Sequence, residues 1–409
     1  MQIGGALEWS IWSVFAAFEV GTIARVGRLV GAGDRAGARR VARLSLGMAI
    51  AIGLVLALAT PLVLAALPLV ATRVSDEAMS EARGYLGVTI AASPIVFVAA
   101  TATATVQARG DTRTPLLIGV GANIIHIALN RVLILGAFGI VPAMGARGAG
   151  ISTAVTFAIE AVLATMALTS RARPVSLRAE GETSGTIREE ASQLVRIGGP
   201  AFLERVLYHL GFMTYALIVT RLGDAAMAAN QSLISVESIC FLSADGFGVA
   251  AAALVAQKLG ADKPDQARSA AWIAARYAVI TLTSFGIGAL LLRDVILPIF
   301  SDDPAVFVIG RSAMPVLAIA QPFMAMGVVL AQALRGAGKT RQALGVSLMG
   351  AVPVRLAAAW LFTIVLGFGL VGVWLGSTTD WLVRAAILAT LFRRRPGEPT
   401  RTEPEPLVQ

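Results

Sequence analysis

The sequence predicts an all-α polytopic membrane protein built of two parallel-repeat helix bundles, with five transmembrane helices in the first bundle and six in the second. Three observations support this fold class. Apolar runs of about 20 residues recur along the chain, and only 14% of its residues are charged, against roughly a quarter in soluble domains. The second half of the chain repeats the first. Basic residues gather in alternate loops, as the positive-inside rule describes for membrane proteins.

The repeat is the strongest of these observations. Residues 230–268 align with residues 1–39 at an offset of 229, and residues 338–341 (GKTR) align with residues 110–113 (GDTR) at an offset of 228. The paired positions include Gln2/Gln231, Glu8/Glu237, Phe18/Phe247, Gly31/Gly260 and Arg39/Arg268. Two separate matches at nearly the same offset indicate an internal duplication, which sets the architecture of the whole chain.

The apolar runs predict eleven spans in order. We expect them at 3–29, 42–70, 84–107, 115–138, 147–169, 194–221, 229–257, 268–299, 305–333, 342–367 and 371–392. Loops with several Lys or Arg residues, such as 31–40, 258–268 and 335–341, alternate with loops that carry acidic residues, such as 73–83 and 302–303. The basic loops and the C-terminus are therefore expected in the cytoplasm. Because corresponding loops of the two copies lie on one side, the repeats are expected to be parallel.

These spans divide the chain into four parts. We expect an N-terminal helix bundle over 1–170, a cytoplasmic linker or surface helix over 171–193, a C-terminal helix bundle over 194–392 and a disordered tail over 393–409. In the second copy a complete span precedes the segment that pairs with residue 1. The duplication therefore predicts that the N-terminal bundle lacks an equivalent first helix, through either a misplaced start or a real deletion.

Composition limits the function. The formal net charge of +9 comes from Lys and Arg in short loops between spans, so it indicates membrane orientation and not a nucleic-acid partner. Cys240 is the only cysteine, which excludes intrachain disulfides and cysteine-based metal sites. We expect a multi-pass protein of the cell (inner) membrane, a monomer in the lipid bilayer, with no cofactor.

Several motifs resemble the recurring signatures of MATE (multidrug and toxic compound extrusion) transporters. They are LVGAGDRAGARR (29–40), VQARGDTRTPLL (106–117), GARGAGISTA (145–154), GGPAFLERVL (198–207), LGDAAMAANQS (222–232), GFGVAAAALVAQKLGA (246–261) and LRGAGKTRQA (334–343). The resemblance covers residues 1 to about 392. It implies two bundles that face each other across a cleft. It also implies exchange of H⁺ or Na⁺ for small amphipathic, often cationic compounds by alternating access.

The chain departs from the family pattern in its fourth span. MATE proteins commonly show Asn-x-x-Asn-x-x-x-Asp there, whereas this chain has Asn123, His126 and Asn130. An amide therefore replaces the carboxylate that one subgroup uses in its N-terminal bundle. That departure puts a proton site of this kind in doubt.

Acidic residues inside the C-terminal bundle are the candidates for ion coupling, because a charged side chain within a membrane costs several kcal/mol and usually marks a functional site. Glu204 matches the acidic position of cation-coupled MATE members, with a structural pairing to Arg205 or Tyr208 as the alternative. Glu237 could approach Glu204 and share an ion with it. Asp245 lies two turns beyond Glu237. Asp380 could join this cluster or pair with Arg384 one turn later.

The N-terminal bundle offers a second set of polar candidates. These are Glu8, Asn123, His126, Asn130, Thr153 and Glu160. Glu8 is the repeat partner of Glu237, and His126 could carry a proton in place of the missing carboxylate. A lone histidine in a span is more often a hydrogen-bonded structural residue.

Two other functions compete with antiport. A flippase for a lipid-linked saccharide precursor would need a strongly basic cleft, and only Arg25, Arg131 and Arg355 lie deep in the spans. A membrane-embedded enzyme of the prenyl transferase kind would need paired Asp motifs to hold Mg²⁺. Only the isolated pair Asp302-Asp303 is present, so we do not expect an enzyme.

Overall fold

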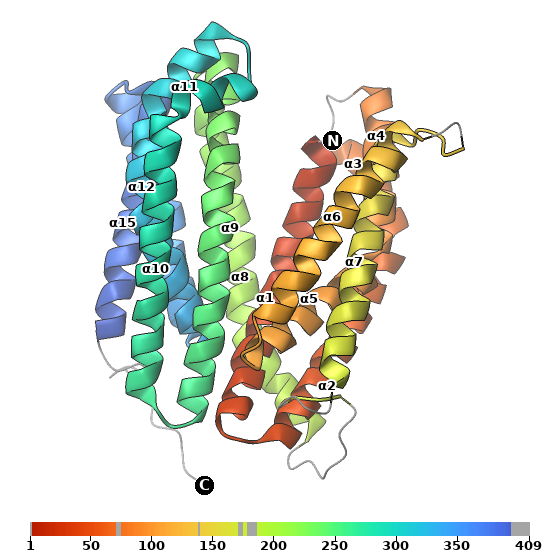
Figure 1. Cartoon of the computed structure of the whole chain (residues 1–409). Helices are drawn as coiled ribbons and strands as arrows, with labels where there is room; N and C mark the ends of the chain where they lie inside the picture. The colour runs from red at the N-terminus through yellow and green to blue at the C-terminus, as the bar shows by residue number, and fades with distance from the viewer. Residues whose placement is uncertain (1, 71–74, 138–139, 171–174, 178–185, 394–409) are drawn as a thin grey trace. The chain divides into compact units, whose positions relative to one another are not determined.

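The structure is a computed structural model that describes residues 2–70, 75–137, 140–170, 175–177 and 186–393 (Figure 1). These residues are almost entirely helical, as expected. The chain divides into two compact units, Met1–Phe202 and Leu203–Gln409. The division falls inside one helix, nine residues after the expected start of the C-terminal bundle at residue 194. The expected tail from residue 394 onward lies outside the described residues.

The first unit holds five long helical segments and the start of a sixth. Its helices are α1 (Gln2–Gly31), α2 (Arg35–Leu58), α3 (Thr60–Val70), α4 (Asp76–Ala91), α5 (Ser93–Ala108), α6 (Arg113–Leu135), α7 (Gly145–Thr169) and the first part of α8 (Ile187–Thr220). Two expected spans are broken: the second between α2 and α3, and the third between α4 and α5, which bend by 53°. The break before α5 comes just ahead of Pro94, whose ring cannot continue a helix without disturbance.

The second unit holds the rest of α8 and five further helical segments. These are α9 (Asp224–Gly260), α10 (Pro264–Leu291) with the short α11 (Arg293–Ile296) and η1 (Leu297–Ile299), α12 (Pro304–Gly336), the segment α13 (Thr340–Met349), η2 (Gly350–Val354), α14 (Arg355–Trp360) and η3 (Leu361–Val365), and α15 (Gly369–Arg393). Both η2 and η3 are π-helical. The wider turns flank Arg355, which is buried.

Eight helices in the described residues are long and apolar enough to cross a membrane, or nine if α4 and α5 form one span. The remaining two of the eleven expected spans correspond to α1 and α15, which are long enough but less apolar. The order of five helical segments before α8 and six from α8 onward agrees with the expected arrangement.

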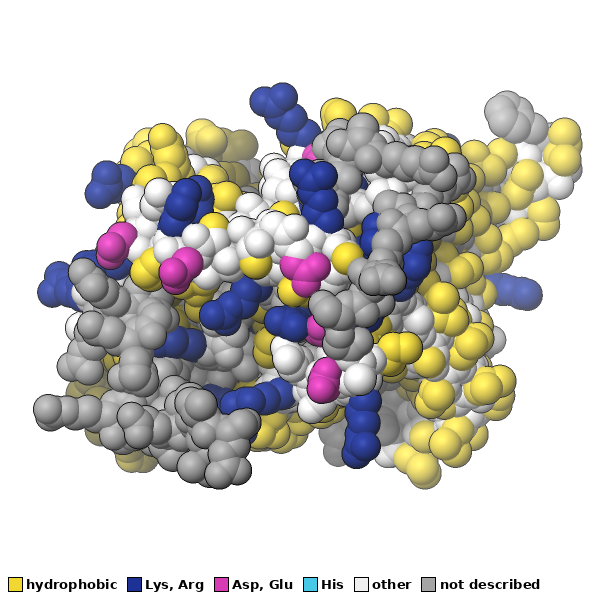
Figure 2. Space-filling view, turned by 90° about the horizontal axis from the view of Figure 1, so that it is seen from below, with side chains coloured by type: hydrophobic (Ala, Val, Ile, Leu, Met, Phe, Trp, Pro, Cys, Tyr) yellow, Lys and Arg dark blue, Asp and Glu magenta, His cyan; other side chains and the backbone are white. Residues whose placement is uncertain are grey.

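Equivalent turns of the two copies have the same backbone conformation. Gly110 and Gly338, paired by the duplication, have φ angles of +91° and +79°. Asp262 occupies the position that corresponds to Gly33, and both have positive φ, +56° and +78°. Aspartate is one of the few residues other than glycine that adopts this conformation. Figure 2, a space-filling view from below Figure 1, shows Lys and Arg side chains, in dark blue, on the face that is seen.

The core of the second unit is built on α12, which packs against α9, α10 and α15 (Figure 1). Small residues let these helices approach closely, as is usual in membranes. Gly336 has no space for a Cβ because the backbone of Ala252 on α9 fills it. In the first unit α5 packs against α1, α2 and α7. There the rings of Phe15 and Phe97 stack with centroids 3.5 Å apart.

Candidate functional site

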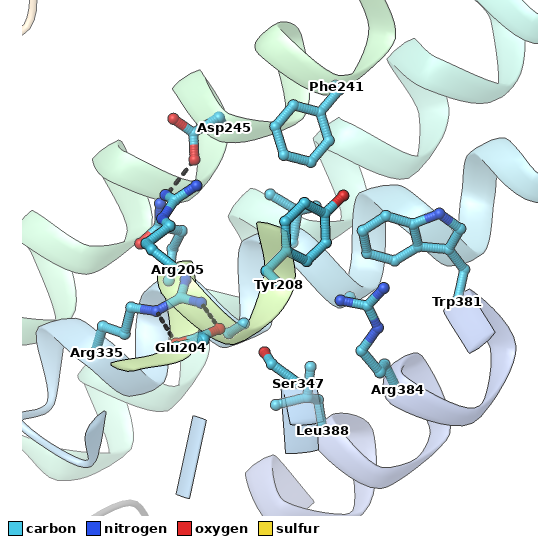
Figure 3. A pocket seen from close by; sticks show the side chains of 14 residues that line it. Glu204, Arg205, Tyr208, Phe241, Asp245, Arg335, Ser347, Trp381, Arg384 and Leu388 are labelled. Atoms are coloured by element: carbon cyan, nitrogen blue, oxygen red, sulfur yellow. Dashed lines mark hydrogen bonds and ion pairs between the residues drawn. The ribbon is translucent and has the colours of Figure 1, made fainter. Parts of the chain in front are cut away.

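A polar cavity lies within the second unit, among α8, α9, α12, α13 and α15 (Figure 3). Its volume is about 60 Å³, well below the roughly 300–1,000 Å³ of a typical small-molecule site. Its polar lining consists of Glu204, Arg205, Asp245, Gln332, Arg335, Ser347 and Arg384, and its aromatic lining of Tyr208, Phe241 and Trp381. The cavity therefore combines aromatic surface with charges of both signs.

Glu204 is buried in this cavity and held by Arg335 from the last turn of α12. Arg335 Nε donates to Glu204 Oε2 at 3.3 Å, and Arg335 Nη2 donates to Glu204 Oε1. The sequence suggested Arg205 or Tyr208 as a structural partner of Glu204. The residue that donates hydrogen bonds to its carboxylate is Arg335. The basic loop 335–341 gave no sign that Arg335 points back into the bundle.

Asp245 lies on α9 and also lines the cavity. Its Oδ1 accepts a hydrogen bond from Gln332 Nε2 at 2.7 Å. Its partner is thus a neutral amide from α12 and not a cation.

Asp380 lies behind the cavity wall, fully buried, between two arginines. Arg355 Nε donates to its Oδ2 at 2.8 Å, and Arg384 Nε donates to its Oδ1 at 2.6 Å. The contact with Arg384 is the one-turn pairing that the sequence suggested. The guanidinium of Arg384 also lies 3.9 Å from the ring centre of Trp381, a cation–π contact. One carboxylate between two arginines leaves this buried triad with one excess positive charge.

Glu237 lies on α9, outside the cavity lining. Its Oε1 is buried and has no hydrogen-bond partner among the described residues. The positive charge of Arg355 acts on it. Glu204 is paired with Arg335 and not with Glu237. The expected sharing of an ion between Glu204 and Glu237 stays a prediction.

Two polar candidates of the first unit, His126 and Asn130, belong to one network between α6 and α7. Asn130 Nδ2 lies 2.9 Å from His126 Nε2, and His126 Nδ1 lies 3.0 Å from Thr156 Oγ1. Ser152 Oγ donates to the carbonyl of His126 at 3.1 Å. The sequence did not single out Ser152 or Thr156, although their spacing of four places them on one face of α7.

The other first-unit candidates stand apart from this network. Asn123 donates to the carbonyl of Gly119 one turn earlier. Thr153 and Glu160 are half-buried on α7. Glu8 lies in α1, but its side chain lies outside the described part of the structure.

Sequence reasoning also missed a charged cluster at the start of α8. Glu190 is buried and accepts hydrogen bonds from Arg25 Nε at 2.8 Å and from Arg40 Nη2 at 2.9 Å. It lies in the segment 171–193, which the sequence predicts to be a linker or a surface helix, and the structure places it in α8. A carboxylate at residue 190 gave no signal of its own, because the two arginines come from α1 and α2, far away in sequence.

The described residues hold no group of three or more His, Cys, Asp or Glu side chains placed to bind a metal ion.

Comparison with known proteins gives consistent results. The MatE family model matches residues 1–132 and 200–361. The chain is 28% identical over 390 residues to the probable multidrug resistance protein NorM of Thermotoga maritima, covering 94% of this chain and 82% of the relative. It is 30% identical over 393 residues to the multidrug resistance protein PmpM of Pseudomonas aeruginosa, covering 92% and 76%.

Solved structures share the fold. An outward-facing multidrug resistance MATE family transporter of the MOP superfamily superposes with a TM-score of 0.87 at 19% identity, covering 96% of this chain and 86% of that one. A MATE structure in complex with MaL6 superposes with a TM-score of 0.86, also at 19% identity, covering 96% and 88%.

Proposed function

Because this chain belongs to the MATE family of multi-pass membrane transporters, we propose that it exports small amphipathic, often cationic compounds in exchange for H⁺ or Na⁺ by alternating access. Its relatives are named as multidrug resistance proteins, and the cavity of the second unit offers aromatic surface and a carboxylate, Asp245, to such compounds. We expect no cofactor other than the coupling ion, and a monomer in the bilayer.

The observation that carries the coupling proposal is the unpartnered oxygen of Glu237. Arg335 holds Glu204, Gln332 donates to Asp245, and two arginines hold Asp380. Glu237 Oε1 is buried in a membrane-spanning helix without a hydrogen bond. An ionised carboxylate in such a place costs several kcal/mol unless a cation or a proton neutralises it. Of the four acidic candidates in this unit, Glu237 is therefore best placed to take up the coupling ion.

The triad gives a physical route from Glu237 to the cavity. Arg355 interacts electrostatically with Glu237 and forms an ion pair with Asp380. Asp380 also forms an ion pair with Arg384 at the cavity wall. Neutralising Glu237 removes a negative charge beside Arg355, so the potential at the cavity becomes more positive. A cationic compound then binds there less tightly. Ion uptake and cation binding therefore oppose each other, which is the linkage that antiport requires.

The test is transport of ethidium by the purified chain in proteoliposomes, with a pH gradient or a Na⁺ gradient imposed separately. We expect one gradient to drive accumulation, and Glu237→Gln to abolish the drive while ethidium still binds at equilibrium. Asp294→Asn is the matched control, since Asp294 is half-exposed and pairs with Arg311 at the surface. Gradient-driven accumulation by Glu237→Gln at the wild-type rate would exclude Glu237 as the coupling residue.

The flippase alternative is not favoured. Two of the three arginines deep in the spans are committed to ion pairs: Arg25 with Glu190 and Arg355 with Asp380. The third, Arg131, is exposed on α6. A pyrophosphate would find no cluster of uncommitted arginines among these three.

A further inference from the structure

We propose that residues 175–177 of the linker form a clasp, which fastens the linker to the first unit. The clasp holds the ends of α1, α5 and α7 and the starts of α2 and α8 together. A linker that served only as a tether would leave these three residues in solvent. The proposal concerns the first unit at rest, so it does not depend on which compound the chain exports or on which ion drives export.

Burial of the clasp is the first reason. Val175 and Ser176 are 0% and 3% exposed. Val175 belongs to an apolar cluster that includes Val26 of α1 and Leu194 of α8. Leu177 packs against this cluster and against a second one, formed by residues of α5 and α7. Removal of apolar surface from water favours association without regard to direction, so these side chains draw the linker into the bundle.

Hydrogen bonds to α7 are the second reason. The backbone N–H of Leu177 donates to the carbonyl of Leu168 at 2.8 Å, and Ser176 Oγ donates to the carbonyl of Thr169 at 3.3 Å. Both carbonyls belong to the last turn of α7, where a helix has no backbone donors of its own to offer. The clasp therefore caps the end of α7.

Two arginines from other helices fasten the backbone of the clasp. Arg109, directly after α5, donates through Nη1 to the carbonyl of Val175 at 3.3 Å and to that of Ala167 at 3.2 Å. Arg43 of α2 donates through Nη2 to the carbonyl of Leu177. Hydrogen bonds from a charged donor are stronger than those between neutral groups. Side-chain packing, a helix cap and two arginines thus act on three consecutive residues.

The internal duplication supplies a comparison within the same chain. At the repeat offsets of 229 and 228, the four arginines that hold the clasp and Glu190 correspond to uncharged residues of the second copy. The pairs are Arg25/Leu254, Arg40/Ser269, Arg43/Trp272 and Arg109/Ala337. The repeat does keep an arginine elsewhere, at Arg39 and Arg268. An arginine needed by the bundle itself would be expected in both copies. These four occur only in the copy that the linker follows, which indicates that they serve the linker and the start of α8.

The test measures opening of the clasp by the rate of thiol labelling. Val175→Cys places a small thiol at a fully buried position of the clasp, in a Cys240→Ser background that removes the only natural cysteine. The purified full chain in phosphatidylcholine nanodiscs reacts with N-ethylmaleimide, which is uncharged. Thr186→Cys, at an exposed position of the linker, gives the rate for an open segment. Opening breaks several hydrogen bonds, so we expect Val175→Cys to react at least about 100-fold more slowly.

A matched pair of arginines tests the fastening. Arg43→Gln, added to the Val175→Cys chain, removes the charged hydrogen bond to Leu177 and should speed labelling by about tenfold. Arg35→Gln is the control, because Arg35 is an exposed arginine of the same helix and lies outside the clasp. Both substitutions remove one positive charge from the start of α2, so a general effect of charge would change both rates equally.

Amide hydrogen exchange of the unsubstituted chain provides a measurement that no cysteine can disturb. The Leu177 amide should exchange at least about 100-fold more slowly than an amide of an unstructured chain. Exchange at the unstructured rate would overturn the proposal, whatever the labelling shows. Equal labelling rates in Arg43→Gln and Arg35→Gln would overturn the fastening by arginine. Both measurements are made without a gradient or a transported compound, so a failure of ethidium export would leave their result unchanged.

Discussion

Arg335 donates a hydrogen bond to each carboxylate oxygen of Glu204, joining the last turn of α12 to α8 inside the second unit. Both side chains are largely removed from solvent. Removing one partner of a buried ion pair leaves the other charge unpaired and costs about 3–5 kcal/mol. Glu204→Gln and Arg335→Gln should each lower the free energy of unfolding in detergent by an amount in this range, which a lower melting temperature would show.

The double variant Glu204→Gln/Arg335→Gln separates structure from coupling. With no charge left unpaired, it should recover most of the lost stability, and a double-mutant cycle should show strong coupling between the two residues. If Glu204 is structural, the double variant still accumulates ethidium under a gradient. A stable double variant that binds ethidium but no longer responds to the gradient would assign the coupling role to Glu204 instead of Glu237.

Close packing between α9 and α12 yields a second prediction. A Cβ at Gly336 would overlap the backbone of Ala252, and backbone cannot move aside as a side chain can. Gly336→Ala should therefore destabilise the second unit by about 1–3 kcal/mol. Gly246→Ala is the control on α9, since nothing lies within 4 Å of its Cβ position. There, the higher helix propensity of alanine should raise stability by up to about 1 kcal/mol. Melting curves in detergent that show equal effects of the two substitutions would contradict this account of the helix contact.

The sequence predicted the fold well because the signals for membrane spans are local. Each span must be apolar along its own length, and the repeat fixed both the number and the order of the helices. The positive φ of Gly33 and Asp262 shows that equivalent turns are retained where the residue type changed. The breaks at Ala59 and Ala92 lie just ahead of Pro61 and Pro94, residues that disturb a helix, although the apolar runs extend across both breaks.

The site was predictable only where its contacts are local. The pairing of Asp380 with Arg384 follows from their spacing of one helical turn. The partner of Glu204 is 131 residues away, at a position that resembled an ordinary basic loop. Arg355 lies directly after the π-helical turn η2, and its contact with Asp380 joins residues 25 apart in sequence, a separation that no local pattern indicates.

The histidine network of the first unit gives a third prediction. His126 Nε2 faces the NH₂ group of Asn130, and Nδ1 faces Thr156 Oγ1, whose own hydroxyl donates to the carbonyl of Ser152 at 2.8 Å. These contacts fit a neutral imidazole with its proton on Nδ1. The network therefore assigns His126 a structural task. His126→Gln should retain the pH dependence of ethidium export, with a modest loss of thermal stability. A shift in the pH profile, with protein levels unchanged, would instead make His126 a proton carrier.

The last prediction concerns two neighbouring glutamates at the start of α8. Glu190 is buried and bonded to Arg25 of α1 and Arg40 of α2, whereas Glu189 is exposed and caps the helix by accepting from the backbone N–H of Thr186.

The substitution to glutamine is the same at both positions, so sequence context and helix propensity are matched. In Glu190→Gln, the amide cannot offset two arginine charges and loses at least one charged hydrogen bond, which contributes about 1.5–3 kcal/mol. The melting midpoint of Glu190→Gln should therefore fall clearly below that of Glu189→Gln.

Salt distinguishes a buried cluster from a surface one. Exposed charges are screened by salt, while buried pairs are screened much less. The difference between the two variants should therefore persist from low salt to 1 M NaCl. If it disappears at high salt, Glu190 acts as a surface charge. In that case the start of α8 is not anchored to α1 and α2 by this carboxylate.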